Sequence, residues 1–152
     1  MKKLFLLFVA CAATTAYAQK FNYKVGIVTG LPVNVTNTSI NAGSTLLETS
    51  TKISKKISAT GNLGYVRITS DEVTLSQIPV LVGAKYNVND QWYFGANVGL
   101  TIPTKKQYGK TEIGYSPYVG YQKGHMSVDA RYYLSGLQAP LSTVALVFSY
   151  SL

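Results

Sequence analysis

Hydrophobic and polar residues alternate with a period of two along most of this chain. The last eleven residues, 142–152, show the pattern most plainly, because every second side chain from Val144 to Leu152 is apolar or aromatic. Such alternation is typical of a β-strand with one face in an apolar environment. No segment after residue 20 shows an apolar stripe of helical period with capping residues around it. The pattern therefore predicts a protein built from strands alone.

The alternation divides the chain into eight predicted strands, each followed by residues that favour turns. The strands are expected at about residues 20–30, 38–48, 56–69, 75–86, 92–102, 111–122, 126–135 and 142–152. Turns or loops are expected between them, at 31–37, 49–55, 70–74, 87–90, 103–110, 123–125 and 136–141.

Strands of this number and length favour a closed membrane barrel. So much sheet without helix is unusual for a globular domain, but it is normal for a barrel. A tilted membrane-spanning strand needs about 9–11 residues, which matches the predicted segments. In a bilayer the last strand must pair with the first, because only closure satisfies every backbone polar group. We therefore predict an all-β fold, an eight-stranded antiparallel up-and-down transmembrane β-barrel with both termini on the periplasmic side.

In such a barrel the apolar face of each strand contacts lipid and the polar face lines the lumen. The predicted polar network of the lumen consists of Lys24, Lys85, Asn97, Glu112, Asp129 and Arg131. Alternation alone does not say which face is inside, so this assignment depends on aromatic residues near the periplasmic strand ends. We expect them to form an interfacial girdle of Tyr23, Tyr86, Trp92, Phe94, Tyr121, Phe148 and Tyr150. The alternative is a soluble periplasmic β-barrel whose apolar face binds an apolar ligand.

The N-terminus has the pattern of a signal peptide. Lys2 and Lys3 precede an apolar stretch at 4–13, and Ala16-Tyr17-Ala18 is a small-x-small cleavage site. We expect a signal peptide at 1–18 and one outer-membrane β-barrel domain at 19–152. An alternative is a lipoprotein signal ending at Cys11, the only cysteine.

Composition limits the partners of the chain. The net charge is +8, but charged residues make up only 13% of the chain and are scattered, so we predict no nucleic-acid partner. A basic balance suits contact with outer-membrane lipid and lipopolysaccharide. One histidine and one cysteine give little basis for a metal site, and we predict no cofactor. We further expect a monomer that engages the barrel-assembly machinery through its C-terminal strand, 142–152.

Three segments, 77–86, 92–100 and 115–121, together with the Ala-Tyr-Ala-Gln cleavage site at 16–19, resemble the small outer-membrane β-barrel proteins common in Bacteroidetes. The resemblance implies an eight-stranded barrel that the outer-membrane assembly machinery delivers. It implies little about biochemical activity.

The function predicted from these features is a structural, envelope or surface-interaction role in the bacterial outer membrane, without catalysis. A narrow, porin-like channel or transporter is the first alternative, since lumen charges could line a pore. A lipid-modifying enzyme is the second, but His125 falls in a predicted periplasmic turn with no serine and carboxylate arranged beside it.

Overall fold

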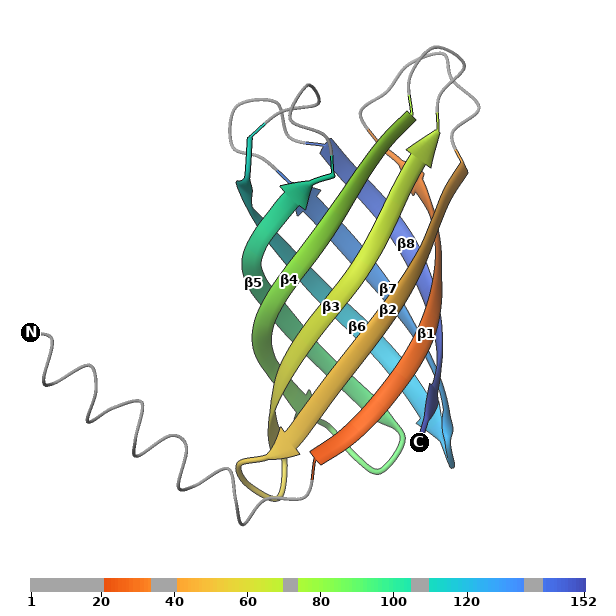
Figure 1. The fold of residues 1–152 in the computed structure, drawn as a ribbon. Helices are drawn as coiled ribbons and strands as arrows, with labels where there is room; N and C mark the ends of the chain where they lie inside the picture. Colours follow the sequence, from red (N-terminus) through yellow and green to blue (C-terminus); the bar gives the residue numbers. More distant parts are fainter. Residues whose placement is uncertain (1–20, 34–40, 70–73, 105–109, 136–140) are drawn as a thin grey trace, which may run out of the picture.

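The computed structural model describes residues 21–33, 41–69, 74–104, 110–135 and 141–152. These residues form one closed antiparallel barrel in which the strands follow each other in chain order and the last pairs with the first (Figure 1). The strands are β1 (Phe21–Pro32), β2 (Asn41–Lys52), β3 (Ile57–Thr69), β4 (Thr74–Asn87), β5 (Trp92–Pro103), β6 (Glu112–Lys123), β7 (Met126–Ser135) and β8 (Leu141–Ser151). The predicted eight-stranded all-β barrel is confirmed. Within the described ranges, no helix is long and apolar enough to cross a membrane.

The strand register fixes how strongly the strands tilt. Following paired residues around the barrel from Asn22 leads back to β1 at Pro32, ten residues further along. In an eight-stranded barrel this stagger corresponds to strands inclined by roughly 40° to the barrel axis. An interior of this size is just wide enough for side chains to fill.

Two predicted boundaries are wrong by more than one residue, and several others differ by a single residue. Residues 49–52 were expected in a turn, but they belong to β2 and pair with 58–61 of β3. The turn occupies 53–56, where the amides of Ile53 and Ser54 donate to the carbonyl of Ile57. A run of serine and threonine resembles a loop in sequence, yet cross-strand pairing satisfies its backbone equally well. Likewise β1 continues through Leu31 and Pro32, which were expected in a loop.

The predicted signal peptide at 1–18 and most of the predicted loop residues at 31–37, 70–74, 103–110 and 136–141 lie outside the described residues.

One end of the barrel, here called the turn end, carries the short connections 53–56, 88–91 and 124–125, the start of β1 and the C-terminus (Figure 1). Two of these turns have clear local causes. The side-chain oxygen of Asn89 accepts hydrogen bonds from the amides of Gln91 and Trp92 at 2.9 and 2.7 Å. Gly124 has a φ of 60° at the first central position of the two-residue β6–β7 hairpin, where a positive φ favours glycine.

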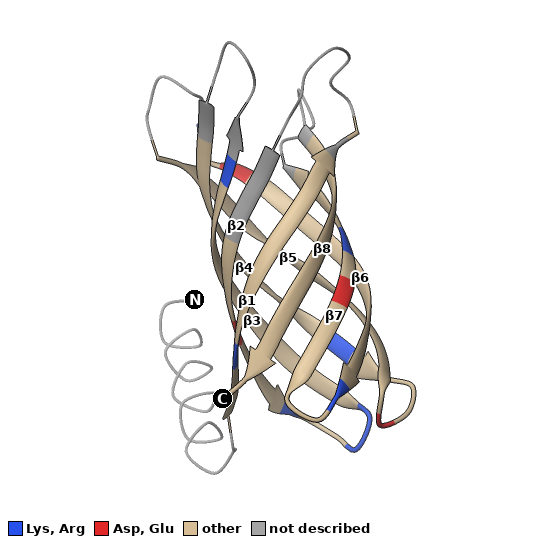
Figure 2. Cartoon of the chain, turned by 90° about the vertical axis from the view of Figure 1, so that its right-hand side faces the viewer, with Lys and Arg blue, Asp and Glu red and all other residues tan. Residues whose placement is uncertain are grey.

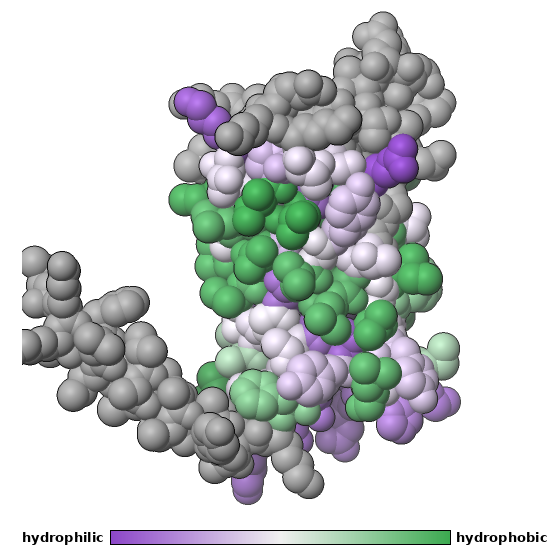
Figure 3. Space-filling view, in the orientation of Figure 1, coloured by the Kyte–Doolittle hydropathy of each residue, from purple (hydrophilic) through white to green (hydrophobic). Residues whose placement is uncertain are grey.

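The barrel is polar inside and apolar outside. Among the described residues, fifteen polar or charged side chains are buried against seven apolar ones. The outward positions are occupied by large apolar residues, such as Ile27, Val82 and Val98, with more than half of their surface exposed. On the face drawn in Figure 3, apolar residues form a band across the middle of the barrel, with polar residues towards both ends. A soluble barrel has the opposite arrangement, because water contacts its outer face.

Candidate functional site: the polar lumen

Arg131 on β7 is the centre of a charged cluster in the lumen. Its guanidinium lies 2.8 Å from the carboxylate of Glu48 on β2 and also pairs with Asp129, two residues earlier on the same strand face. A third, longer contact of 3.4 Å reaches the side-chain oxygen of Asn62. The guanidinium carbon of Arg131 lies 4.5 Å from the centroid of the Tyr118 ring. Arg131 thus ties β7 to β2, β3 and β6 in the middle of the barrel.

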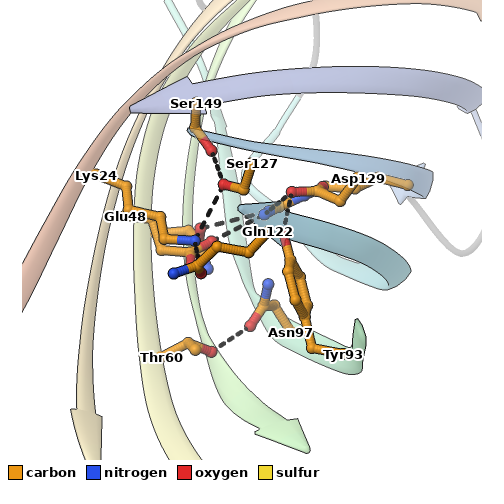
Figure 4. Close-up of polar contacts among 11 residues, drawn as sticks. Lys24, Glu48, Thr60, Tyr93, Asn97, Gln122, Ser127, Asp129 and Ser149 are labelled. Carbon is orange, nitrogen blue, oxygen red and sulfur yellow. Dashed lines mark hydrogen bonds and ion pairs between the residues drawn. The ribbon is translucent and has the colours of Figure 1, made fainter. Parts of the chain in front are cut away.

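Two lysines, Lys24 and Lys85, lie on the turn-end side of Arg131, and neither forms an ion pair with another described residue. The Lys24 ammonium donates to the side chains of Gln122 and Ser127 at 3.0 and 3.1 Å. The ammonium groups of Lys24 and Lys85 lie 5.4 and 5.2 Å from the ring centroid of Tyr93. In Figure 4 the side chains of Gln122 and Ser127 extend towards the end of Lys24, and the Tyr93 hydroxyl points towards Asp129. Cation–π contacts of this kind favour the charged lysines most where water is excluded.

Tyrosine and glycine interlock between β5 and β6. Tyr93 lies opposite Gly120, and Tyr118 lies opposite Gly95, so each ring faces a residue without a side chain. A Cβ atom at Gly95 would come within 2.6 Å of the Tyr118 hydroxyl, and one at Gly120 would overlap the Tyr93 ring. The two rings then meet edge to face, with centroids 6.1 Å apart. These glycines make room for the only two tyrosines that are fully buried among the described residues.

On the other side of Arg131, away from the turn end, an apolar cluster lies in the lumen, and the polar residues Thr101, Ser142 and Thr143 are buried further towards that end. Val28, Leu46, Ala145 and Val147 form a buried cluster against which Tyr133 packs. The residues come from β1, β2, β7 and β8, which are neighbours in the barrel. Along these strands the charged cluster is therefore followed by an apolar cluster.

A polar cavity of about 410 Å³ opens at the turn end. Lys24, Lys85 and Tyr93 line its inner part, and Lys52 and Lys55 lie at the mouth. Figure 2 places several of the Lys and Arg residues at this lower end of the barrel. The cavity and the charged cluster are the most distinctive features of the described lumen.

The structure brings five of the six predicted network residues into one buried region. Lys24, Lys85, Asn97, Asp129 and Arg131 are all buried in the lumen. Asn97 takes part through its side-chain oxygen, which accepts a hydrogen bond from Thr60 at 2.7 Å. Glu112 stands apart, only partly buried at the start of β6, at the opposite end from the turns.

Sequence analysis missed Glu48, the carboxylate partner of Arg131. The predicted second strand ended at this residue, so its side chain was assigned to a strand boundary instead of the lumen. The alternation of Leu46, Glu48 and Ser50 as inward residues was the available signal. An acidic residue at an inward position needs a partner, because Glu is almost never fully buried unless it is paired.

The seven predicted girdle residues all lie on the outer surface near the turn end. Two cross-strand pairs contact each other, Tyr86 with Phe94 and Trp92 with Tyr121, each with ring centroids 5.2 Å apart. Tyr23, Phe148 and Tyr150 are exposed on β1 and β8, on either side of the seam that closes the barrel. Aromatic residues at one level on adjacent strands are typical of a membrane interface.

His125 is exposed in the β6–β7 turn. Its Nδ1 lies 3.1 Å from the carbonyl of Ser151, and its ring stacks on Tyr150. These contacts tie the turn to the end of β8. No group of three or more histidine, cysteine, aspartate or glutamate residues with metal-binding geometry occurs in the described ranges.

No protein-family model matches the chain, and no curated protein matches it. Solved structures match its fold. The outer membrane protein Ail of Yersinia pestis in a phospholipid nanodisc is 14% identical with a TM-score of 0.64, over 88% of this chain and 100% of that chain. The N-terminal β-barrel domain of Pseudomonas aeruginosa OprF is 9% identical with a TM-score of 0.61, over 88% and 99%. The outer membrane enzyme PagL is 10% identical with a TM-score of 0.59, over 84% and 98%.

At these identities the likeness shows the fold alone, that of outer-membrane β-barrels with eight strands. An enzyme shares this fold, so the fold does not separate catalytic from structural barrels.

Proposed function

We propose that this protein is an integral outer-membrane β-barrel with a structural or surface-interaction role and no catalytic activity. The observation that carries the proposal is the apolar band around a barrel with a charged interior. Exposed apolar surface of this extent would favour aggregation in water, whereas it is stabilised by contact with lipid. The polar interior also argues against a soluble barrel that holds an apolar ligand.

The orientation follows from the turns and termini. In bacterial barrels the short turns and both termini lie on the periplasmic side. The turn end is therefore proposed to face the periplasm, with the seven aromatic residues at the inner headgroup level. Amphipathic rings are stabilised at this depth because their polar atoms reach water while the ring stays in lipid.

The lumen is proposed to be closed to solutes. The Arg131 cluster ties β7 to β2 and β3 across the interior, and the apolar cluster next to it fills the lumen along β1, β2 and β8. A channel is the second candidate function, because charged residues line the turn-end cavity. Planar-bilayer recordings separate the two: the closed barrel gives no steps, whereas a channel gives steps whose size changes when Asp129 or Arg131 is neutralised.

Assembly is proposed to proceed through β8, as in the Bacteroidetes-type small barrels that the chain resembles. β8 closes the sheet against β1, and the amide of Leu152 donates to the carbonyl of Tyr23 at 2.9 Å. Contact with the barrel-assembly machinery through 142–152 would present this strand for closure, after which the barrel stands in the lipid as a monomer.

The first experiment is heat modifiability combined with cell fractionation. The folded barrel should run at a different gel mobility before and after boiling, and it should fractionate with the outer membrane. A soluble protein without a mobility shift would contradict the membrane proposal. Lipid A profiles of cells with the wild-type protein and with His125→Ala should be the same, and a lipid change that depends on His125 would contradict the absence of catalysis.

A further inference from the structure

The turn-end cavity combines enclosure with an excess of positive charge. Four lysines line it, Lys24 and Lys85 at the inner part and Lys52 and Lys55 at the mouth. The acidic side chain that lines the cavity is that of Asp90. This residue is exposed, so water screens its charge.

The two inner lysines are buried without a carboxylate partner. Lys24 and Lys85 are 4% and 6% exposed. The two carboxylates of this region, Glu48 and Asp129, are both bound to Arg131, and they form the only ion pairs found between described residues. Buried charges are normally paired because removal from water is costly.

Lys85 has the greatest unused binding capacity. Its ammonium carries three donors and is in contact with the Tyr93 ring, but none of the described residues accepts a hydrogen bond from it. The Lys24 ammonium uses two donors on Gln122 and Ser127 and keeps the third. Both side chains reach a cavity that opens to water. The site therefore presents buried donors and positive charge to any solute that enters from the turn end.

We propose that this cavity binds a small oxyanion, a phosphate or carboxylate group carried by a solute that enters at the turn end. The oxyanion would accept charge-assisted hydrogen bonds from Lys85 and Lys24, which are about twice as strong as bonds between neutral groups. A volume of about 410 Å³ accommodates an oxyanion together with a small organic part. The asparagine, glutamine and serine side chains that line the cavity supply neutral hydrogen-bond donors for the organic part of the solute. This binding role goes beyond the structural role proposed above and does not require the lumen to conduct.

The test is isothermal titration of the folded mature protein in zwitterionic micelles. Sodium phosphate and sodium citrate are titrated separately, with sodium chloride used to keep the ionic strength constant. Saturable binding of one equivalent is expected for at least one of them. Binding of phosphate alone assigns the site to phosphoryl groups, and binding of citrate alone assigns it to carboxylates.

Lys85→Met should weaken this binding by about tenfold or more, because a buried charged partner is removed. Lys56→Met is the matched control, since Lys56 is an exposed lysine of the same rim outside the cavity lining. It should change the affinity by no more than about twofold. If Lys85→Met does not fold, Lys24→Met takes its place with the same expectation.

Thermal unfolding separates a binding role of Lys85 from a structural one. Without ligand, the unfolding midpoint of Lys85→Met should equal or exceed that of the wild type, because an unpaired buried charge is removed. Phosphate or citrate should raise the midpoint of the wild type but not that of Lys85→Met. Three results would overturn the proposal. They are the absence of saturable binding up to about 10 mM of either anion, equal affinities in Lys85→Met and wild type, and an equal loss in Lys56→Met.

Discussion

The most informative single perturbation is the replacement of Arg131 by methionine. The guanidinium is almost fully buried, and it holds the carboxylates of Glu48 and Asp129, two buried residues. Methionine keeps much of the side-chain volume but leaves both carboxylates without their partner. Breaking a buried ion pair in this way costs about 3–5 kcal/mol of unfolding free energy. We expect about 3 kcal/mol, the lower end, because Lys24 and Lys85 lie in the same lumen and can partly compensate.

A double-mutant cycle isolates the ion pair from the change in packing. Glu48→Gln and Arg131→Met are measured singly and together, and a coupling energy of about 2 kcal/mol is expected between residues that touch. The double variant keeps the net charge of the lumen residues at its wild-type value, since one acid and one base are removed.

Urea unfolding in lipid vesicles provides the assay. Trp92, the only tryptophan, lies on the outer surface and reports the loss of its lipid environment by fluorescence. Arg67→Met, at an exposed arginine on β3, is the control and should shift stability by less than about 0.5 kcal/mol. A coupling energy below about 0.5 kcal/mol would refute the reasoning, because the cluster would then not hold the strands together.

Three further predictions test other parts of the barrel. Gly120→Ala should destabilise the protein by about 1–3 kcal/mol in the same urea assay, because the added methyl group would overlap the Tyr93 ring. Gly61→Ala is the control and should cost clearly less, because a Cβ there would meet only one side-chain atom, at 3.1 Å. Equal losses of stability would contradict the tyrosine–glycine interlock. Val98→Lys, in the middle of the apolar band, should cost about 2–4 kcal/mol, whereas Ile57→Lys at the rim should cost about 0–1 kcal/mol; no difference between them would contradict the proposed membrane position. Trp92 fluorescence should be quenched more strongly by lipids brominated near the headgroup than near the acyl-chain end, and the reverse order would contradict the girdle.

The alternation of apolar and polar residues was enough to predict the fold class and the direction of most side chains. Alternation in 92–102 placed Trp92, Phe94 and Val98 outside and Asn97 inside, because a strand sends successive side chains to opposite faces. The same rule carried Lys24, Lys85 and Arg131 into the lumen. It fails at β2, where the segment Thr-Ser-Thr-Lys at 49–52 has no apolar face and therefore predicts a turn instead of a strand.

Which of the inward residues contact each other depends on how the strands are placed around the closed barrel. Glu48 and Arg131 are 83 positions apart in the chain, and their contact depends on the stagger of ten residues around the barrel. The alternation of side chains has a period of two whatever the stagger between strands. It therefore does not tell which residues of β2 and β7 lie at the same height in the barrel. The tyrosine–glycine interlock and the lysine-lined cavity have the same origin: barrel closure in one particular register brings together side chains that the sequence keeps apart.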